Sequence, residues 1–452
     1  MAALVRVSAE LKASDMSPLN GNAKDGGRYD PAFTGNRAHP LHRWVPWVAG
    51  YSAKFVDDVL DTYNGRAVRS RVLDPFAGVG TTLVEARLHG CDTVGFELNP
   101  WPALVSRIKL AAGKELRAES LRSAVTAYRA FCASHPRAAR KVPTGFKSNI
   151  PFFSPSIERK VLLTLDFIDS IDDPWTRGAF RVALGSVMVS FSNYTYEPSL
   201  GSRPGAGKAL IERADVEAII AIKAEQMAED IQTIERAAET PDTERTVYNT
   251  SFLDYATVEA GTFDLAITSP PYLNNYHYIR NTRPQMWWLG LVSDAEAQKQ
   301  VELRSMGKYW QTVRAGDPIH LTFGHDELTR TLRRLRATRT AHGVYGGRGW
   351  ANYVGSYFND TYRYLTVLYA ALREGGRAVV VVGNSVVQGI PIPVEKHVAE
   401  IGKLVGFSHE ATNVLRTTRV GGSILNSSVR RGTKTGVDVG LYEAAVILRR
   451  RV

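Results

Sequence analysis

The amino-acid sequence predicts an α/β fold whose core is a Rossmann-like, mostly parallel sheet. The first observation is an apolar strand at 70–74, followed by a glycine turn, a helix over 81–89 and a strand at 93–97. The second is an apolar strand at 263–268 that ends in two prolines. The third is a β-branched strand at 378–382 that follows a long helical segment. Strands that alternate with helices in this way are typical of doubly wound sheets.

Two stretches interrupt this alternation. Residues 113–245 have helical periodicity, and within them Ser154 can cap a helix that has Pro155 at its first position. Apolar side chains then recur at helical spacing until Pro174 ends the run. Residues 283–351 are richer in Arg, Trp and Gly. We therefore expect a helical insertion and a basic insertion in the sheet domain.

The C-terminal hundred residues return to the alternating pattern. A helix is expected over 353–373, ended by Gly375 and Gly376, and another over 394–405, with final strands at 411–416 and 442–448. The predicted parts of the chain are a loose N-terminal tail (1–30), the first part of the sheet domain (31–112), the helical insertion (113–245), the second part of the sheet domain (246–282), the basic insertion (283–351) and its C-terminal part (352–452).

Composition narrows the class of protein. The 452 residues carry a formal net charge of +11, and a basic surface attracts polyanions, of which nucleic acid is the commonest. No segment approaches the roughly 20 apolar residues of a membrane span, and the N-terminus lacks a signal-peptide pattern. The only cysteines, Cys91 and Cys132, have no metal-ligand spacing. We expect a cytoplasmic protein without a disulfide or a zinc site.

A glycine-containing motif ends the first strand and reads Asp-Pro-Phe-Ala-Gly-Val-Gly-Thr-Thr over 74–82. Gly78 and Gly80 allow a sharp turn into the helix and a close approach of the backbone to a ligand. The start of that helix presents free backbone N–H groups. An acidic Asp74 would repel a pyrophosphate but suits an ammonium group, so the motif favours the methionine end of a nucleoside cofactor over a dinucleotide.

The second strand ends in Glu97, about twenty residues after the turn, where a carboxylate can accept both ribose hydroxyls of a nucleoside. Asn99 and Pro100 follow at the start of the next helix. A glycine pair alone is a weak signal. Together with Glu97 and Asn99 it favours a nucleoside site over a purely structural turn.

A second motif, Thr-Ser-Pro-Pro-Tyr at 268–272, follows the strand at 263–268. Two prolines stop the hydrogen-bond ladder and fix the backbone, so their carbonyls are available to a ligand. Ser269 adds a hydroxyl acceptor, and Tyr272 adds a flat face for a base. An exocyclic amino group is a poor nucleophile because its lone pair is delocalised into the ring. Acceptors that hold both amino hydrogens would localise that lone pair toward a methyl sulfonium.

With these two motifs, the sequence resembles the DNA methyltransferases that form N4-methylcytosine or N6-methyladenine. The segment 51–55 resembles their N-terminal cofactor motif, in which an aromatic residue packs near the cofactor, and 378–384 is similar to their fifth strand. The resemblance implies a seven-stranded class I methyltransferase sheet, S-adenosyl-L-methionine as methyl donor, and a base flipped out of double-stranded DNA. The implied cofactor-binding residues are Phe55, Asp74, Phe76, Gly78, Gly80, Thr81, Thr82, Glu97, Asn99 and Thr268. The implied catalytic residues are Ser269, Pro270, Pro271 and Tyr272.

The sequence departs from that family in three ways. The family's third-strand motif offers an acid near the cofactor adenine, whereas residues 247–252 here contain none, and Asn249 or Thr250 are the candidate substitutes. The cofactor motif precedes the catalytic motif, the reverse of many cytosine-N4 enzymes. The helical stretch falls between the second and third strands, which leaves open whether it or the basic insertion recognises the target.

The basic insertion contains a run of arginines, Arg330, Arg333, Arg334, Arg336 and Arg339. Such a run is commonly a solvated helix face, but a protein that binds a polyanion can use it to contact phosphates. His277 lies just beyond the catalytic motif, and a lone histidine there is more often structural than catalytic.

The sequence therefore predicts a site-specific DNA methyltransferase that acts on cytosine N4. The reason is that Ser269 precedes the Pro-Pro-Tyr residues, whereas the adenine-methylating enzymes of the family that the chain resembles more often have Asp or Asn at this position. Adenine N6 is the first alternative. An RNA base methyltransferase and a catalytically idle DNA-binding subunit are the others. The resemblance also makes a cognate restriction enzyme a candidate partner.

Overall fold

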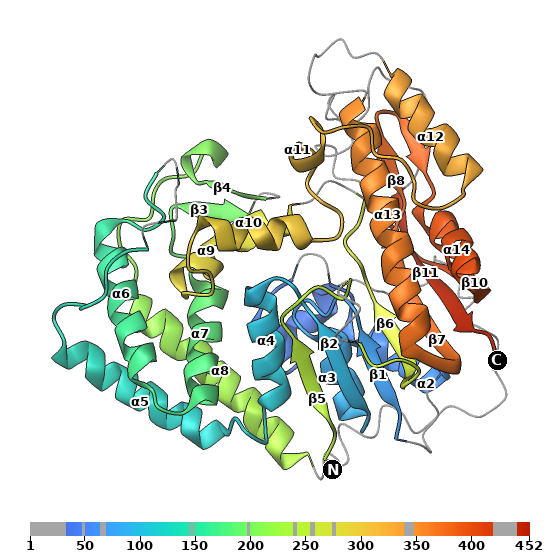
Figure 1. Cartoon of the computed structure of the whole chain (residues 1–452). Coiled ribbons are helices and arrows are strands. Elements are labelled where there is room, and N and C mark those ends of the chain that lie inside the picture. Colours follow the sequence, from blue (N-terminus) through green and yellow to red (C-terminus); the bar gives the residue numbers. More distant parts are fainter. Residues whose placement is uncertain are drawn as a thin grey trace.

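The computed structural model describes residues 33–47, 50–63, 69–143, 145, 148, 150–196, 199–237, 242–253, 258–273, 277–338, 348–418 and 441–452. These residues form a seven-stranded sheet in the order β10-β11-β7-β6-β1-β2-β5 (Figure 1). Neighbours from β5 to β7 are parallel, whereas β11 is antiparallel to β7 and to β10. The strands are β1 (Arg71–Asp74), β2 (Asp92–Phe96), β5 (Arg245–Tyr248), β6 (Phe263–Thr268), β7 (Leu372–Gly383), β10 (Phe407–Thr418) and β11 (Leu441–Arg450). The expected seven-stranded sheet is confirmed.

Helices cover both faces of the sheet (Figure 1). They are α2 (Ala53–Tyr63), α3 (Thr81–Leu88), α4 (Pro100–Ala111), α5 (Ala118–Ser134), α6 (Pro155–Ser170), α7 (Pro174–Val187), α8 (Val216–Arg236), α9 (Tyr278–Trp288), α10 (Ala295–Arg304), α11 (Trp310–Val313), α12 (Asp326–Ala337), α13 (Arg348–Ala371) and α14 (Val394–Val405). Short 3-10 turns occupy Phe33–Arg37, His42–Trp44 and Pro204–Ala206. Two small hairpins pair β3 (Tyr194–Tyr196) with β4 (Leu200–Ser202) and β8 (Ser385–Val387) with β9 (Ile390–Ile392). None of the helices in these ranges is long and apolar enough to cross a bilayer.

Alternating side chains of the strands supply two separate cores. In β7, Val379 and Val381 pack in one cluster with α2, while Val380 and Val382 pack in another with α13 and α14. Side chains of a strand point to opposite faces in turn. A central strand buried on both faces therefore needs the uninterrupted β-branched run that predicted it.

Helices α5 to α8 form a helical lobe beside the sheet, at the left of Figure 1. Its core is continuous with the packing around α3 and α4, and Trp287 and Trp288 of α9 belong to the same cluster. The helical periodicity predicted for this stretch is confirmed, but the β3–β4 hairpin within it was not predicted.

Two local predictions differ from the structure. Ser154 precedes α6, but its hydroxyl donates to the carbonyl of Ile211 at 2.7 Å rather than capping the helix. The helical run does end before Pro174, at Ser170, and Pro174 starts α7. The helix predicted over 353–373 begins at Arg348, and Gly375, with φ of +75°, lies inside β7 instead of ending a helix. That glycine accompanies a register irregularity between β6 and β7, so the strand continues through the turn.

A buried carboxylate fastens the segment that precedes α2 to the helical lobe. Asp230 of α8 is 1% exposed and accepts hydrogen bonds from the Leu41 backbone N–H at 3.0 Å and from Trp44 Nε1 at 2.9 Å. Its other oxygen accepts from Arg43 Nη2 at 2.6 Å. One side chain therefore satisfies three donors from a single short segment.

We expect Asp230→Ala to lower the free energy of unfolding by about 3–5 kcal/mol, because it leaves buried donors without a partner. Chemical denaturation monitored by tryptophan fluorescence measures the loss. Glu229→Gln is the matched control. The Glu229 side chain is 68% exposed, and its long ion pair with Arg43, at 3.8 Å, should contribute little to stability. Equal stability of the two variants would contradict the role given to Asp230.

Candidate active site

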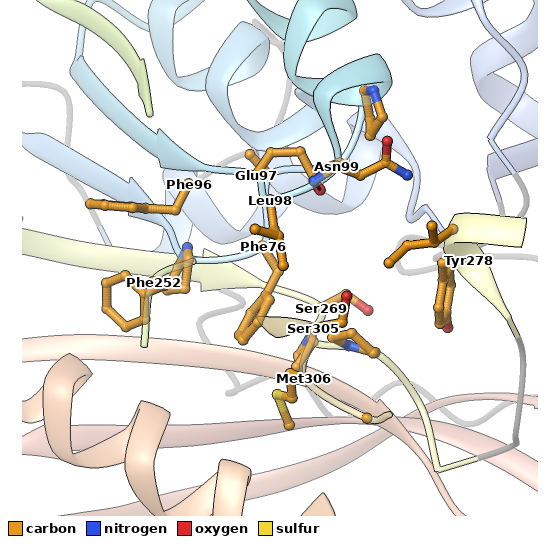
Figure 2. Close-up of a pocket in the computed structure, with 18 of the residues that line it drawn as sticks. Phe76, Phe96, Glu97, Leu98, Asn99, Phe252, Ser269, Tyr278, Ser305 and Met306 are labelled. Carbon is orange, nitrogen blue, oxygen red and sulfur yellow. Dashed lines mark hydrogen bonds between the residues drawn. The ribbon is translucent and has the colours of Figure 1, made fainter. Parts of the chain in front are cut away.

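One cavity lies at the carboxyl ends of β1, β2 and β6. In parallel α/β sheets this edge is where ligands bind. Figure 2 shows Glu97 and Asn99 on one side of the opening, Ser269 and Ser305 on the other, and Tyr278 at one end. The lining residues from the two sequence motifs are Asp74, Pro75, Phe76, Ala77, Gly78, Val79, Thr81, Glu97, Leu98, Asn99, Ser269, Pro270 and Pro271. The structure therefore brings the predicted cofactor motif and the predicted catalytic motif to one cavity.

The glycine turn between β1 and α3 has the geometry that the sequence predicted. Gly78 and Gly80 have φ of +52° and +83°, which side chains other than glycine rarely adopt. A Cβ on Gly80 would lie 2.9 Å from the Ser106 hydroxyl, and one on Gly78 would lie 3.3 Å from Trp47 Nε1. Ser106 of α4 in turn donates to the Gly78 carbonyl at 2.7 Å. A side chain at Gly80 would therefore clash with Ser106 of α4, and one at Gly78 would crowd Trp47.

Glu97 is held by backbone N–H groups at the end of β2. Its Oε2 accepts from Gly78 N at 2.9 Å, and its Oε1 accepts from Asn99 N at 2.7 Å. Burial raises the pKa of Glu97 to about 7, against the lowering effect of these two hydrogen bonds. Each carboxylate oxygen retains acceptor capacity for a further donor, so Glu97 can bind a vicinal diol.

Asp74 is 2% exposed and is surrounded by hydroxyl and amide donors. It accepts from the Thr268 hydroxyl at 2.7 Å, from Phe76 N at 3.0 Å and from the Tyr51 hydroxyl at 3.3 Å. Burial raises the pKa of Asp74 to about 6, while these hydrogen bonds lower it. Thr82 joins the same network through the Tyr51 hydroxyl and donates to the Ile267 carbonyl at 3.2 Å.

Tyr51 is the aromatic residue of the 51–55 segment that reaches the cavity. Phe55 is 1% exposed and packs behind it, with ring centroids 5.6 Å apart. Tyr51 lines the cavity and Phe55 does not. The sequence predicted Phe55 as the cofactor-binding residue of this motif, whereas the residue at the cavity is Tyr51, four positions earlier and just before α2.

Asn99 connects the cofactor motif to α9. Its Oδ1 accepts from Trp101 N at 3.2 Å and caps α4, and its Nδ2 donates to the Thr282 hydroxyl at 2.7 Å. The capping bond satisfies a free N–H at the helix start. The side chain therefore orients two helices that border the cavity.

Ser269, Pro270 and Pro271 line the cavity directly after β6, but Tyr272 does not. The Tyr272 ring packs against Gly383 at the end of β7, where an added Cβ would lie 3.1 Å from Tyr272 Cδ2. In this conformation the Tyr272 ring lies against β7 and not in the cavity lining.

The third-strand segment contributes neutral residues to the cavity. Thr250, Ser251 and Phe252 line it, and the Phe252 ring packs edge-on against Phe96 at 5.2 Å. The side chain of Asn249 donates to the backbone carbonyls of Glu97 and Leu98 at 2.8 and 3.0 Å and is not among the lining residues. Thr250, one of the two candidates for the missing acid, is the one at the cavity wall.

A second wall comes from the end of α10 and the segment before α11, which the sequence did not identify. Its lining residues are Glu302, Ser305, Met306, Gly307, Lys308, Tyr309 and Thr312. A Cβ on Gly307 would lie 3.3 Å from Pro271 Cβ and 3.6 Å from Tyr357 Cδ2 of α13. No sequence motif marks this segment. Its place beside the predicted catalytic motif follows from long-range packing, which brings Gly307 close to Pro271.

His277 also lines the cavity and begins α9. Its Nδ1 accepts from Arg280 N at 3.1 Å, and its ring lies 4.4 Å from that of Tyr309. Burial lowers the pKa of His277, which keeps its imidazole neutral. The helix-capping bond agrees with the structural role favoured by the sequence.

The arginine run lies on α12, away from the cavity lining. Leu328, Leu332 and Leu335 bury one face of this helix, while Arg330, Arg333 and Arg334 are exposed. Arg336 is half-buried and donates to the Ile319 carbonyl at 2.7 Å, so it is engaged within the protein. Arg339 lies outside the described residues.

Comparisons with known proteins place the chain among methyltransferases. No protein-family model matches it. It is 21% identical over 419 residues to the type II methyltransferase M.BsoBI of Geobacillus stearothermophilus. That alignment covers 83% of this chain and 80% of the relative. The chain is 22% identical over 423 residues to the type II methyltransferase M.AvaI of Nostoc sp., in an alignment that covers 89% and 85%.

Among solved structures, the rRNA methyltransferase aviRa from Streptomyces viridochromogenes aligns over 92% of each chain, with 10% identity and a TM-score of 0.30. A shorter match, 32% identical over 62 residues, is to the type II methyltransferase M.MjaII of Methanocaldococcus jannaschii. Over most of its length, this chain is a distant relative of the type II methyltransferases.

Proposed function

We propose that the chain transfers a methyl group from S-adenosyl-L-methionine to the exocyclic N4 amino group of cytosine in a specific double-stranded DNA sequence. The observation that carries the proposal is the single cavity that joins the Gly78–Gly80 turn, Glu97 and the Ser269-Pro270-Pro271 segment. The type II methyltransferase relatives support DNA as the substrate. Ser269 at the head of the Pro-Pro-Tyr motif is the support for cytosine over adenine.

The residues of the cavity fit the cofactor. Glu97 would accept the two ribose hydroxyls, since both of its oxygens are fixed by backbone N–H groups and face the cavity edge. The glycine turn borders the cavity through Gly78, whose backbone a ligand could approach closely. The negative charge of Asp74 would attract the methionine ammonium, while its hydrogen bonds to Thr268 and Phe76 hold the turn in place.

When bound, S-adenosyl-L-methionine supplies a methyl group on a sulfonium sulfur, an electrophile that a neutral amine can attack directly. The Ser269 hydroxyl and the Pro270 carbonyl would accept the two amino hydrogens and so direct the nitrogen lone pair at the methyl group. Flipping the base out of the duplex costs a few kcal/mol, which contacts in the pocket must offset.

The direct test is to incubate the protein with S-adenosyl-L-methionine and duplex DNA, digest the DNA to nucleosides and separate them by mass spectrometry. N4-methylcytosine is the expected product. N6-methyladenine as the sole product would overturn the choice of base and leave the DNA methyltransferase assignment standing. Methylation of RNA with none on DNA would overturn the substrate class.

Glu97→Gln should weaken S-adenosyl-L-methionine binding by roughly 1.5–3 kcal/mol, about ten- to a hundredfold in Kd, because it removes a charged acceptor. Because the pKa of Glu97 is raised to about 7, wild-type binding should weaken as pH falls through that value. The variant should lose this step and retain only the smaller dependence expected from Asp74 near pH 6.

Isothermal titration calorimetry across this pH range measures both effects. Glu244→Gln is the matched control, because Glu244 precedes β5 at the opposite edge of the sheet and pairs with Arg71. Unchanged affinity in a folded Glu97→Gln variant would place the cofactor elsewhere.

Ser269→Ala should slow single-turnover methyl transfer by roughly five- to a hundredfold, the effect of losing one hydrogen bond to a buried polar group, with little change in cofactor affinity. Tyr272→Phe keeps the ring against Gly383 and removes only a hydroxyl of a residue that does not line the cavity. It should therefore slow transfer less. Near-normal transfer by Ser269→Ala would remove the catalytic assignment of this motif.

Replacing Arg330, Arg333 and Arg334 with Gln should weaken DNA binding without changing sequence preference. Each lost phosphate contact should reduce the slope of log affinity against log salt by about one unit. Fluorescence anisotropy over a range of salt concentrations gives that slope. The comparison is a triple replacement by Gln of Arg122 and Arg129 on α5 and of Arg117, which precedes α5. A change confined to it would assign DNA contact to the helical lobe.

A further inference from the structure

Three potential metal ligands converge between α12 and α14. His325 immediately precedes α12, while His397 and Glu400 lie one turn apart on α14. One ligand atom from each residue lies within 4.8 Å of the other two. Glu400 Oε2 is 2.9 Å from His325 Nε2 and 3.7 Å from His397 Nδ1. The cysteine pattern gave no sign of a metal, and this cluster joins parts of the chain about seventy residues apart.

The cluster does not have the geometry of a hydrogen-bonded network. His325 Nε2 and His397 Nδ1 are both buried, and neither has a hydrogen-bond partner among the described residues. The short distance from His325 to Glu400 therefore lacks the alignment of an N–H···O bond. Buried polar nitrogens are normally satisfied. These three potential ligand atoms lie close together without hydrogen-bonding to one another, as the ligand atoms around a metal ion do.

We propose that His325, His397 and Glu400 bind one divalent transition-metal ion of the zinc class. Two imidazoles and one carboxylate are a ligand set that Zn²⁺ accepts, with tetrahedral geometry and a water molecule as the fourth ligand. The Glu400 side chain is 37% exposed, so the site is open to solvent on that side. The proposal is independent of the methyl-transfer assignment.

The surroundings of the two histidines suit this role. The His397 side chain is 1% exposed, and its ring packs edge-on against Phe358 at 5.3 Å. Phe323 packs edge-on against His325 at 6.3 Å. The apolar walls would strengthen the bond between the metal and its charged ligand.

Binding has a defined cost at His325. Its Nδ1 accepts a long hydrogen bond, 3.3 Å, from Leu328 N and so caps α12. Coordination through Nε2 places the ring proton on Nδ1, and this capping bond is then given up. The ion would replace it with a bond between the same helix terminus and α14. The Lys396–Glu327 ion pair, 2.8 Å apart, already joins the two helices at the surface.

The consequence is that the ion would fix the position of the arginine-bearing helix. Leu328 and Leu332 hold α12 against the rest of the protein through apolar contacts, and Arg336 adds a hydrogen bond to the Ile319 carbonyl. A coordination bond at its N-terminus would restrict the movement of this helix further. The metal would therefore have a structural role at some distance from the cavity.

The test is to strip the full-length protein with a chelator, reload it with Zn²⁺, remove free ion by gel filtration and measure bound metal by mass spectrometry. The wild type should retain about one equivalent of Zn²⁺, and Zn²⁺ should raise its melting temperature. Glu400→Gln should bind Zn²⁺ at least roughly tenfold more weakly and show no such rise. Co²⁺ in place of Zn²⁺ should give the visible absorption of a tetrahedral site in the wild type and lose it in His325→Gln.

Glu400 is at the surface, so its replacement by Gln should not impair folding, which S-adenosyl-L-methionine binding to the variant checks. His409→Gln is the control, because this histidine is paired with Thr412 on β10 and should leave Zn²⁺ binding unchanged. Wild-type protein that retains no Zn²⁺, or that retains as much as Glu400→Gln, would overturn the proposal.

Discussion

The hydrogen bond from Thr268 to Asp74 joins the two halves of the candidate active site. The two residues are 194 positions apart in the chain and end the neighbouring parallel strands β1 and β6. Because parallel strands present their carboxyl ends at one edge of the sheet, both motifs begin at this 2.7 Å contact. Asp74 also accepts from Tyr51 and from the start of the glycine turn, so one buried carboxylate sets the positions of α2, the turn and the catalytic segment.

Burial of two carboxylates in this cavity gives the site its electrostatic character. Asp74 and Glu97 both have pKa values raised by desolvation, and the negative charge of Asp74 raises the pKa of Glu97 further. A bound cation offsets such a cost, whereas a bound anion increases it. The cavity therefore favours a ligand that carries positive charge, which agrees with a sulfonium and an ammonium group and disfavours a phosphate.

The parts of the structure that follow from local pattern were predictable from the sequence. The strands at β1, β2 and β6 and the helix α14 appear where apolar periodicity and turn residues placed them, because a buried strand or an amphipathic helix imposes that pattern directly. Gly78, Gly80 and Glu97 could be identified because their backbone geometry and charge are specific. By contrast, the choice of Tyr51 over Phe55, the position of the Tyr272 ring and the wall from Ser305 to Tyr309 depend on long-range packing. No local pattern encodes the contact of Gly307 with Pro271.

The hydrogen bonds between Asp230 and the segment from Leu41 to Trp44 limit which parts of the chain can be exchanged independently. The segment that Asp230 holds, Leu41 to Trp44, leads directly to Trp47, whose indole lies against the glycine turn. The helical lobe is thus connected to the cavity wall through the chain that precedes the sheet. Recombination that exchanged this lobe alone would leave the Asp230 partners behind. The lobe and the segment from Leu41 to Trp44 would therefore have to be exchanged together, although Asp230 lies 189 positions from Leu41 and 186 from Trp44.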